Sequence, residues 1–261
     1  MDESIGTKWQ RTDVNSISVR PIAFGGVEEG RDEVSRILVV DDDPALLRVL
    51  SMGLGARGHV MTTAKSGRDA LAYVATAATD LVLLDLGLPD LDGLDVCRRI
   101  RATSDVPIIV LSADANEGRK IAALEGGADD YVVKPFGMGE LEARVRLAAR
   151  HWGERVTTDS ISPIVLGPLE IDLDRHRATM AGSAVDLTPR EFDILAFLAH
   201  HPGKVLTHQM ILSEVWGPGY TKDVHYLRVY VHRLRRILED ERGEFLRTEP
   251  GVGYSLDSNS F

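Results

Sequence analysis

The chain has 261 residues, of which 27% are charged and 44% hydrophobic, and its 40 Asp and Glu against 30 Lys and Arg give a net charge of −10. This length predicts two domains, and the composition argues against bulk disorder. The single cysteine, Cys97, excludes an internal disulfide and indicates a reducing compartment. The acidic balance argues at first against a nucleic-acid partner, because clustered lysine and arginine bind phosphate backbones.

The first 35 residues show no sustained apolar period and contain the pair Gly25-Gly26. We expect residues 1–35 to be a disordered, mobile tail, with a start codon placed too early as the alternative. No stretch approaches the roughly 18 uncharged apolar residues of a membrane span. The N-terminus has neither a basic start nor a long apolar run, which argues against a signal peptide. We therefore expect a cytoplasmic protein with no membrane contact.

From Arg36 onward, predicted strands and helices alternate five times. Apolar runs at 37–40, near 59–62, and at 81–84, 106–111 and 131–133 predict buried strands. Periodic segments between and after them predict helices, the first capped by Asp43 and opened by Pro44, the last over 138–150. This alternation predicts an α/β domain over residues 36–151, with a doubly wound parallel sheet of five strands.

The rest of the chain has a different pattern. Residues 152–163 are polar and aperiodic, as is typical of a linker, and weak alternation over 164–187 predicts a small antiparallel sheet. A capping-box pattern from Thr188 to Glu191 predicts a helix through His200, followed by helices at about 207–215 and 222–238. The chain closes with a predicted hairpin. We expect an α+β domain over residues 164–257.

Polar side chains follow four of the predicted strands. Asp41 and Asp42 follow the first strand, and Asp85, Ser112 and Lys134 end the third, fourth and fifth. Ligands of doubly wound sheets bind beyond the carboxyl ends of the strands, so these side chains should converge. Three bare carboxylates repel one another, and Mg²⁺ would relieve that repulsion. One such aspartate alone is better explained as a solvated turn or helix cap. The set of them predicts phosphoryl transfer to an aspartate.

Residues 36–151 resemble the receiver domain of two-component response regulators, which has a flavodoxin-like fold. The resemblance implies that Asp85 is phosphorylated by a sensor histidine kinase, and that Lys134 contacts the phosphoryl oxygens. It implies further that Ser112 turns toward those oxygens, that Tyr131 swings inward and that the Lys134–Pro135 bond is cis. It implies Mg²⁺ bound by Asp41, Asp42, Asp85 and the Gly87 carbonyl. The matching stretches are Ile37 to Asp43, Leu83 to Asp90, Val110 to Ala113, Gly127 to Tyr131 and Lys134 to Phe136.

Charged residues of alternating sign gather on the last receiver helix, the strand before it and the preceding helix. On their own they are typical of a solvated face, where each exposed pair contributes about 0–1 kcal/mol. The family resemblance implies instead a symmetric dimer interface, with pairs such as Lys120–Glu140 and Asp129–Arg144 crossing between subunits. The residues assigned to this interface are Lys120, Glu125, Asp129, Asp130, Glu140, Arg144 and Arg150.

The predicted helix 222–238 carries positive charge inside an acidic domain. Residues 222–236 contain five Lys and Arg and one Asp. A helical projection gives a buried stripe and, opposite it, a polar arc. The stripe consists of Val224, Leu227, Val231, Leu234 and Leu238. The arc consists of Lys222, His225, Val229, His232, Arg233 and Arg236, with Arg228 at its margin. A solvated face is one interpretation. The preceding helix pair and the following hairpin favour a winged helix whose third helix enters a major groove.

Residues 163–257 resemble the winged-helix effector domain of OmpR/PhoB-type response regulators. The resemblance implies DNA contacts by the arc and by Arg228, whereas Pro250 stands where many members have arginine and argues against a minor-groove contact. The matching stretches are Leu187 to Phe192, Gly203 to Thr207, Glu214 to Gly217, Val231 to Arg236 and Gly251 to Tyr254. The stretches His225 to Tyr230 and Lys134 to Leu141 resemble the KdpE-like branch, which regulates potassium uptake.

These observations predict a phosphorylation-dependent DNA-binding transcription regulator rather than an enzyme. Its expected partners are a sensor histidine kinase, promoter DNA and, on phosphorylation, a second copy of itself. One alternative is a receiver coupled to a protein-binding winged helix without a DNA target, suggested by the acidic domain and the wing that lacks arginine. A second alternative, an independent hydrolase, is disfavoured because the only evident nucleophile is the acceptor aspartate itself.

Overall fold

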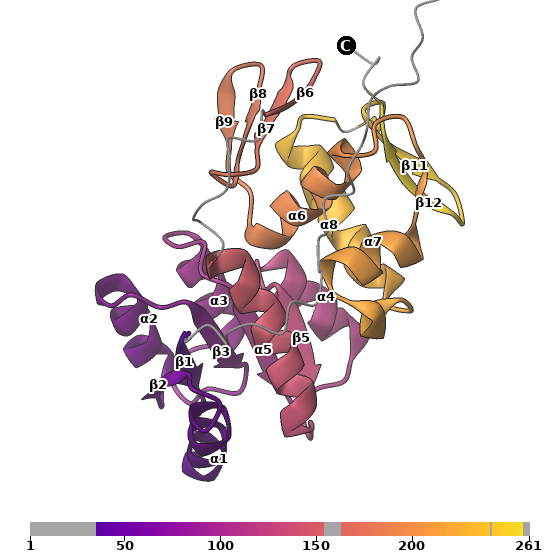
Figure 1. The fold of residues 1–261 in the computed structure, drawn as a ribbon. Coiled ribbons are helices and arrows are strands. Elements are labelled where there is room, and N and C mark those ends of the chain that lie inside the picture. Colours follow the sequence, from indigo (N-terminus) through magenta and orange to yellow (C-terminus); the bar gives the residue numbers. More distant parts are fainter. Residues whose placement is uncertain (1–34, 154–162, 241, 258–261) are drawn as a thin grey trace, which may run out of the picture.

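The computed structural model describes residues 35–153, 163–240 and 242–257. The expected tail, apart from Ser35, and most of the expected linker lie outside these residues. The described part of the chain forms an α/β domain followed by an α+β domain (Figure 1). No helix in that part is long and apolar enough to cross a membrane.

The first domain is built on a parallel five-stranded sheet with the strand order β2-β1-β3-β4-β5. Helices α1 and α5 pack on one face of the sheet, and α2, α3 and α4 pack on the other. The strands are β1 (Arg36–Val40), β2 (Val60–Ala64), β3 (Leu81–Asp85), β4 (Ile108–Ser112) and β5 (Asp130–Val133). The helices are α1 (Pro44–Gly55), α2 (Gly67–Thr76), α3 (Gly93–Arg101), α4 (Glu117–Glu125) and α5 (Met138–Gly153).

Local sequence explains these elements. β3 and β4 are buried along their whole length, as strands covered by helices on both faces require. The Asp43 carboxylate accepts a hydrogen bond from the backbone N–H of Ala45 and caps α1, with Pro44 in its first turn. The expected doubly wound sheet is confirmed. Several boundaries differ from expectation: β2 begins at Val60 and runs to Ala64, β4 begins at Ile108 and ends at Ser112, and α5 continues to Gly153.

The second domain contains two antiparallel sheets and three α-helices. A capping box between Thr188 and Glu191 starts the first of these helices, as expected. One sheet has the order β6-β7-β8-β9 and the other β10-β12-β11. The four strands of the first sheet are β6 (Ile164–Leu166), β7 (Leu169–Asp172), β8 (Arg177–Met180) and β9 (Ser183–Val185). The remaining elements are α6 (Pro189–Ala199), β10 (Leu206–Thr207), α7 (His208–Val215), the short 3₁₀ helix η1 (Pro218–Tyr220), α8 (Val224–Ile237), β11 (Leu246–Glu249) and β12 (Gly253–Leu256).

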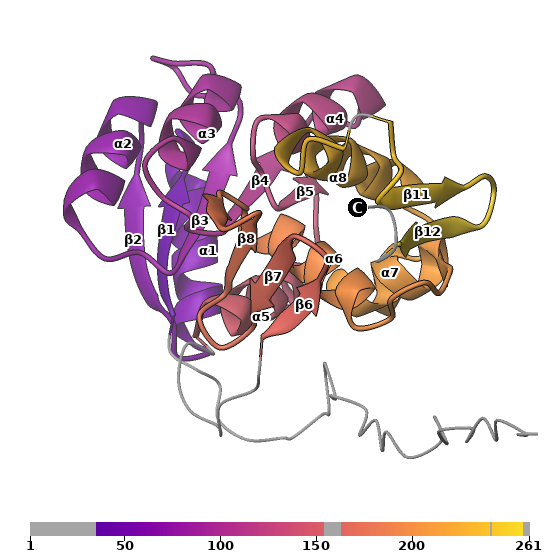
Figure 2. The same ribbon diagram turned by 90° about the horizontal axis from the view of Figure 1, so that it is seen from above.

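The two domains pack directly against each other. Helix α8 lies alongside α4 (Figure 2). One apolar core runs without a break from the α2–α4 side of the receiver sheet into the interior of the second domain. The sequence patterns predicted each domain separately and did not predict this contact.

A substitution at Gly253 tests how closely β12 packs against β10 in the C-terminal sheet. A Cβ atom at this position would lie 1.8 Å from the Leu206 carbonyl oxygen of the adjacent strand β10, so Gly253→Ala forces the two backbones apart. We expect the free energy of unfolding to fall by about 1–3 kcal/mol, measured by urea denaturation. Gly219→Ala is the control, since nothing lies within 4 Å of its Cβ position. Equal losses in the two variants would contradict the close approach.

Candidate phosphoacceptor site and nucleic-acid interface

A lysine joins two buried aspartates at the carboxyl ends of the receiver strands. The Lys134 Nζ atom lies 2.6 Å from Asp41 Oδ2 and 2.5 Å from Asp85 Oδ1. Asp41 is 1% exposed and Asp85 is 7% exposed, whereas Asp42 is exposed. Burial lowers the pKa of the Lys134 ammonium, but the hydrogen bonds to Asp41 and Asp85 outweigh it and raise this pKa above its usual value. The ammonium is therefore charged at neutral pH and balances two carboxylates.

Backbone N–H groups fix the remaining oxygens of the pair. Asp41 Oδ1 accepts a 2.9 Å hydrogen bond from the N–H of Asp43, and Asp85 Oδ2 accepts a 2.6 Å bond from the N–H of Gly87. Both donors lie two residues beyond the aspartate that they hold, so each carboxylate is oriented by the turn that follows its strand. The acceptor oxygens are thus set in place before any ligand binds.

The oxygen donors around Asp85 suit a hard divalent cation. Mg²⁺ takes one or two carboxylates, carbonyl oxygens and several waters, and Asp41 and Asp85 offer carboxylate oxygens of this kind. Among the described residues, no three His, Cys, Asp or Glu side chains are grouped tightly enough to hold a metal by themselves. The donor set therefore fits an ion that keeps much of its water, and it does not fit a closed protein cage.

Ser112 and Tyr131 both contact the loop that follows β4. Ser112 Oγ accepts a 3.1 Å hydrogen bond from the Asp114 N–H, and the Tyr131 hydroxyl donates a 2.6 Å bond to the Asp114 carbonyl. Tyr131 is buried, and this burial raises the pKa of its hydroxyl. The Lys134–Pro135 peptide bond is cis.

The charged face of α4, β5 and α5 is arranged differently from the expectation. Asp129 forms an ion pair with Arg101 at 2.8 Å, and Arg144 binds Asp130 at 2.9 Å and Glu140 at 2.7 Å. Asp129 and Arg144 each have a partner in their own chain, and their pairing across a dimer stays a prediction. Lys120 is half-buried and Glu125 is exposed, while the side chain of Arg150 lies outside the described residues.

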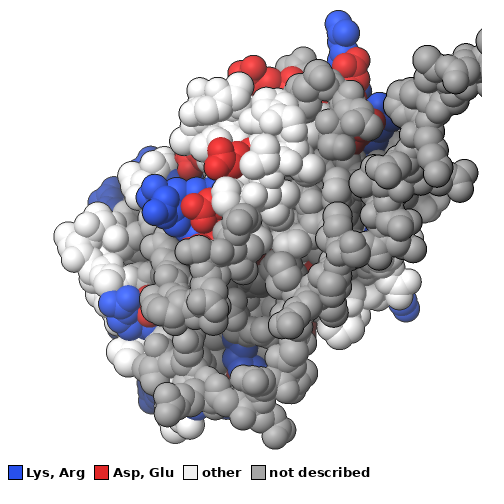
Figure 3. Space-filling view, turned by 45° about the horizontal axis from the view of Figure 1, so that its top comes forward, with Lys and Arg blue, Asp and Glu red and all other residues white. Residues whose placement is uncertain are grey.

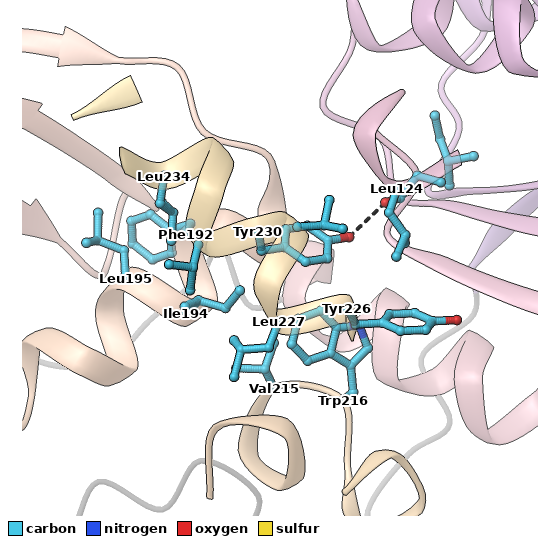
Figure 4. Packing of buried hydrophobic residues seen from close by; sticks show 14 of the residues in the cluster. Leu124, Phe192, Ile194, Leu195, Val215, Trp216, Tyr226, Leu227, Tyr230 and Leu234 are labelled. Carbon is cyan, nitrogen blue, oxygen red and sulfur yellow. Dashed lines mark hydrogen bonds between the residues drawn. The ribbon is translucent and has the colours of Figure 1, made fainter. Parts of the chain in front are cut away.

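The second domain covers this same face with aromatic side chains. Figure 4 shows Trp216, Tyr226 and Tyr230 lying between α8 and the receiver, with the Tyr230 hydroxyl donating across the boundary. Tyr230 donates to the Ala128 carbonyl at 2.8 Å, and Trp216 Nε1 donates to the Asp129 carbonyl at 3.2 Å. Tyr226 donates to the Tyr131 carbonyl at 3.2 Å, and Tyr220 donates to the Asp130 carboxylate.

Asp130 is a buried carboxylate between the domains. It receives the Tyr220 hydroxyl, the Tyr131 N–H at 2.7 Å and the Arg144 guanidinium, which also lies 4.5 Å from the centre of the Tyr220 ring. Burial raises the pKa of Asp130 to about 6, although the nearby Arg144 charge and the Tyr131 N–H act in the opposite direction. This carboxyl therefore takes up a proton within the range of mildly acidic conditions.

The structure divides the basic arc of α8, the predicted recognition helix, into two parts. Arg228, His232 and Arg236 are exposed, as is Lys222 just before the helix, and His225 is half-buried. Val229, expected to face a groove, is only 8% exposed. Its neighbours Tyr226 and Tyr230 turn toward the receiver, so this edge of the helix is covered.

Arg233 was also expected to face a groove and is held inside the molecule. Its Nε atom lies 2.7 Å from Glu191 Oε1, and its NH1 group donates to the Leu124 carbonyl of α4 at 2.8 Å. Arg235 was missed by sequence reasoning: it donates to the Leu246 carbonyl and, at 2.7 Å, to Thr248 Oγ1. Arg235 thereby positions the hairpin.

On the face shown in Figure 3, the described basic and acidic side chains lie in small groups, several of which contain both signs. The net charge of the chain therefore says little about the recognition helix, whose exposed residues Arg228 and Arg236 are basic.

Comparison with known proteins decides the family. Residues 37–146 match the family described as "Response regulator receiver domain", and residues 182–256 match "Transcriptional regulatory protein, C terminal". The transcriptional regulatory protein KdpE of Mycobacterium tuberculosis is 42% identical over 225 residues, covering 85% of this chain and 99% of the relative. The chain belongs to the OmpR/PhoB family of two-component response regulators.

Two further relatives show the range of this likeness. The transcriptional regulatory protein PrrA of Mycobacterium leprae is 44% identical over 223 residues, covering 85% of this chain and 95% of the relative. A solved structure of a RitR mutant superposes with a TM-score of 0.68 at 26% identity, covering 85% of this chain and 98% of that one. The KdpE relative agrees with the KdpE-like stretches in the sequence. Members of the family are DNA-binding transcription regulators and not enzymes.

The buried carboxyl of Asp130 makes the regulator's stability depend on pH. Its pKa is raised from 3.8 to about 6, so the folded chain takes up the proton more readily than the unfolded chain. The resulting stabilisation is complete below pH 3.8 and is lost as pH rises through about 6. We expect the free energy of unfolding, relative to Asp130→Asn, to rise by about 1 kcal/mol from pH 7 to pH 5 in urea denaturation. Parallel pH profiles for the two proteins would contradict this assignment.

Proposed function

We propose that this regulator accepts a phosphoryl group on Asp85 from a sensor histidine kinase and, as a homodimer, binds promoter DNA in the cytoplasm. The observation that carries the proposal is the Lys134 ammonium held between Asp41 and Asp85 at the strand ends. A cation beside an oriented carboxylate is what an attacking aspartate needs, because charge develops on the phosphoryl oxygens during transfer.

Each residue of the pocket then has a defined task. An Asp85 oxygen attacks phosphorus, the new P–O bond forms as the P–N bond of the kinase phosphohistidine breaks, and the electron pair leaves with the imidazole. Lys134 moves from the two carboxylates toward the phosphoryl oxygens. Ser112 donates its hydroxyl to one of them. Asp41, Asp42, Asp85 and the Gly87 carbonyl would hold Mg²⁺, which neutralises charge on the transferring group when bound.

The DNA contact is assigned to the recognition helix and the residues beside it. Its exposed members suit phosphates or guanine edges, and its covered members become available only when α8 leaves the receiver. The residues assigned to DNA are Lys222, His225, Arg228, Val229, His232, Arg233 and Arg236. Because Val229 is buried and Arg233 binds the Leu124 carbonyl of the receiver, a DNA contact by these two residues requires α8 to leave its present position.

The dimer contact is assigned to the α4–β5–α5 face, which the effector domain occupies in this structure. Intramolecular closure and dimer formation therefore compete for one surface. The residues assigned to the dimer are Lys120, Glu125, Asp129, Asp130, Glu140, Arg144 and Arg150. For Asp129 and Arg144 to pair across subunits, each must first leave its present partner. A dimer also joins two DNA contacts, which raises both affinity and specificity.

Asp85→Asn tests the acceptor assignment. Asparagine keeps the shape of the side chain but lacks the nucleophilic carboxylate, so we expect no incorporation of phosphate from a radiolabelled acyl phosphate in the presence of Mg²⁺. Asp95→Asn is the matched control, because Asp95 is an exposed carboxylate paired with Arg98 on α3, and it should label like the wild-type chain. Labelling that persists in Asp85→Asn would place the acceptor elsewhere.

Arg228→Ala and Arg236→Ala test the recognition helix. Each should weaken duplex binding by the phosphorylated chain and reduce the slope of log affinity against log salt concentration by about one, since each arginine displaces about one counterion. Fluorescence anisotropy over a salt series gives this slope. Arg68→Ala, which removes an exposed arginine of the receiver, should leave the slope unchanged. An unchanged slope in both helix variants would remove these arginines from the DNA contact.

A further inference from the structure

Residues 86–92 join β3 to α3 directly after Asp85, and we call this segment the phosphoacceptor loop. Its residue Asp90 is half-buried and reaches the start of α2. Asp90 Oδ1 accepts a 2.8 Å hydrogen bond from the Gly67 N–H, and Oδ2 accepts a 3.1 Å bond from the Arg68 N–H. One carboxylate thus bridges the phosphoacceptor loop and the N-terminus of a separate helix.

Helix α2 already has an N-cap of its own. Ser66 Oγ accepts a 3.2 Å hydrogen bond from the Asp69 N–H. The first N–H groups of a helix have no acceptor within it, and Asp90 accepts from the two that precede Asp69. The bond from Gly67 contributes most to holding the pKa of Asp90 below its usual value, so this carboxylate is charged at neutral pH. The exposed Arg68 guanidinium, 4.0 Å from Asp90, adds little.

The start of α2 lies very close to the phosphoacceptor loop. A Cβ atom on Gly67 would lie 3.1 Å from Leu91 Cβ in the loop and 2.6 Å from Val96 Cγ2 of α3. The backbone of α2 is therefore in direct contact with the residue that follows Asp90. This close approach brings the two N–H groups within reach of a side chain as short as aspartate.

The phosphoacceptor loop is held at three points along its length. At its start, the Gly87 N–H donates to the Asp85 carboxylate at 2.6 Å. At its end, the Gly93 N–H donates to the Leu86 carbonyl at 3.3 Å, and a Cβ atom on Gly93 would lie 2.6 Å from the Asp85 carbonyl oxygen. Of these contacts, only the bridge made by Asp90 ties the loop to an element outside the β3–α3 connection.

We propose that Asp90 is a positioning residue, which holds the phosphoacceptor loop against α2 so that Gly87 keeps the place required for Mg²⁺ binding and phosphoryl transfer at Asp85. This inference rests on the proposed function, in which the Gly87 carbonyl is a metal ligand. Mg²⁺ requires nearly octahedral geometry, so a carbonyl on a displaced loop binds it poorly. Groups that orient metal ligands through hydrogen bonds typically contribute roughly 10- to 100-fold to metal affinity.

The full-length variant Asp90→Ala tests the proposal. It removes both bridging hydrogen bonds, so the Mg²⁺ dissociation constant of the unphosphorylated chain, measured by titration calorimetry, should rise about 10-fold. The Mg²⁺ concentration that half-saturates labelling by a radiolabelled acyl phosphate should rise by the same factor. The labelling rate at saturating Mg²⁺ should stay near the wild-type value, because Asp90 acts through the loop and not on the phosphoryl group. A variant that is merely less well folded would instead lose maximal labelling.

Two further variants separate positioning from other effects. Asp90→Asn keeps one carbonyl oxygen for the Gly67 N–H, but its amide nitrogen cannot accept from the Arg68 N–H, so we expect an intermediate Mg²⁺ constant. Equal constants for Asp90→Asn and Asp90→Ala would assign the effect to charge and contradict positioning. Ser66→Ala is the matched control at the same helix end. It removes the acceptor of the Asp69 N–H but leaves the bridge, so it should lower the Tm and leave the Mg²⁺ constant unchanged.

Amide hydrogen exchange adds a measurement that needs neither metal nor phosphoryl donor. In Asp90→Ala the amides of residues 86–92 should exchange faster than in the wild type and in Ser66→Ala. An unchanged Mg²⁺ constant in Asp90→Ala, in a protein whose wild type is labelled, overturns this inference alone. A wild type that shows no Mg²⁺-dependent labelling overturns the proposed function, while exchange still reports whether Asp90 holds the loop.

Discussion

The structure depends most on one electrostatic constraint, the ammonium of Lys134 between the carboxylates of Asp41 and Asp85. Asp41 is almost fully buried, and a buried carboxylate without a counter-charge costs several kcal/mol. Asp41 follows β1, Asp85 ends β3 and Lys134 follows β5, so their contact fixes the relative positions of these strands at one edge of the sheet. The positive charge that makes this arrangement stable is also the charge that a phosphoryl group on Asp85 would attract.

Helix α8 packs against the receiver and is also the helix proposed to bind DNA. Its apolar stripe packs into the effector domain, one flank carries Tyr226 and Tyr230 against the receiver, and only the remaining arc is exposed. With the proposed DNA contact, DNA and receiver would exclude each other over part of α8. By thermodynamic linkage, if phosphorylation raises the affinity for a duplex by some factor, binding of that duplex stabilises the phosphorylated form by the same factor.

The sequence predicted local elements and the phosphoacceptor pocket better than it predicted contacts between domains. The convergence of Asp41, Asp85 and Lys134 could be predicted because strand ends in a doubly wound sheet meet at one edge, whatever the loops do. Val229 and Arg233 were assigned to an open arc because helical periodicity distinguishes apolar from polar faces but cannot say what covers a face. Tyr226 and Tyr230 gave no signal on their own, since buried tyrosine is common and their acceptors are backbone carbonyls about 100 residues earlier.

β5 ends the receiver sheet, because the strand order leaves it with β4 as its one neighbour. A terminal strand of this kind presents unpaired backbone groups that can pair with another chain and begin aggregation. β5 is only four residues long, and the effector domain covers it with hydroxyl and indole donors that satisfy carbonyls at this end of the sheet. Separation of the domains thus exposes the unpaired backbone of β5 together with the aromatic rings that covered it. In the proposed dimer a second copy of the receiver would shield that edge again, and dimerisation would then favour solubility as well as affinity for DNA.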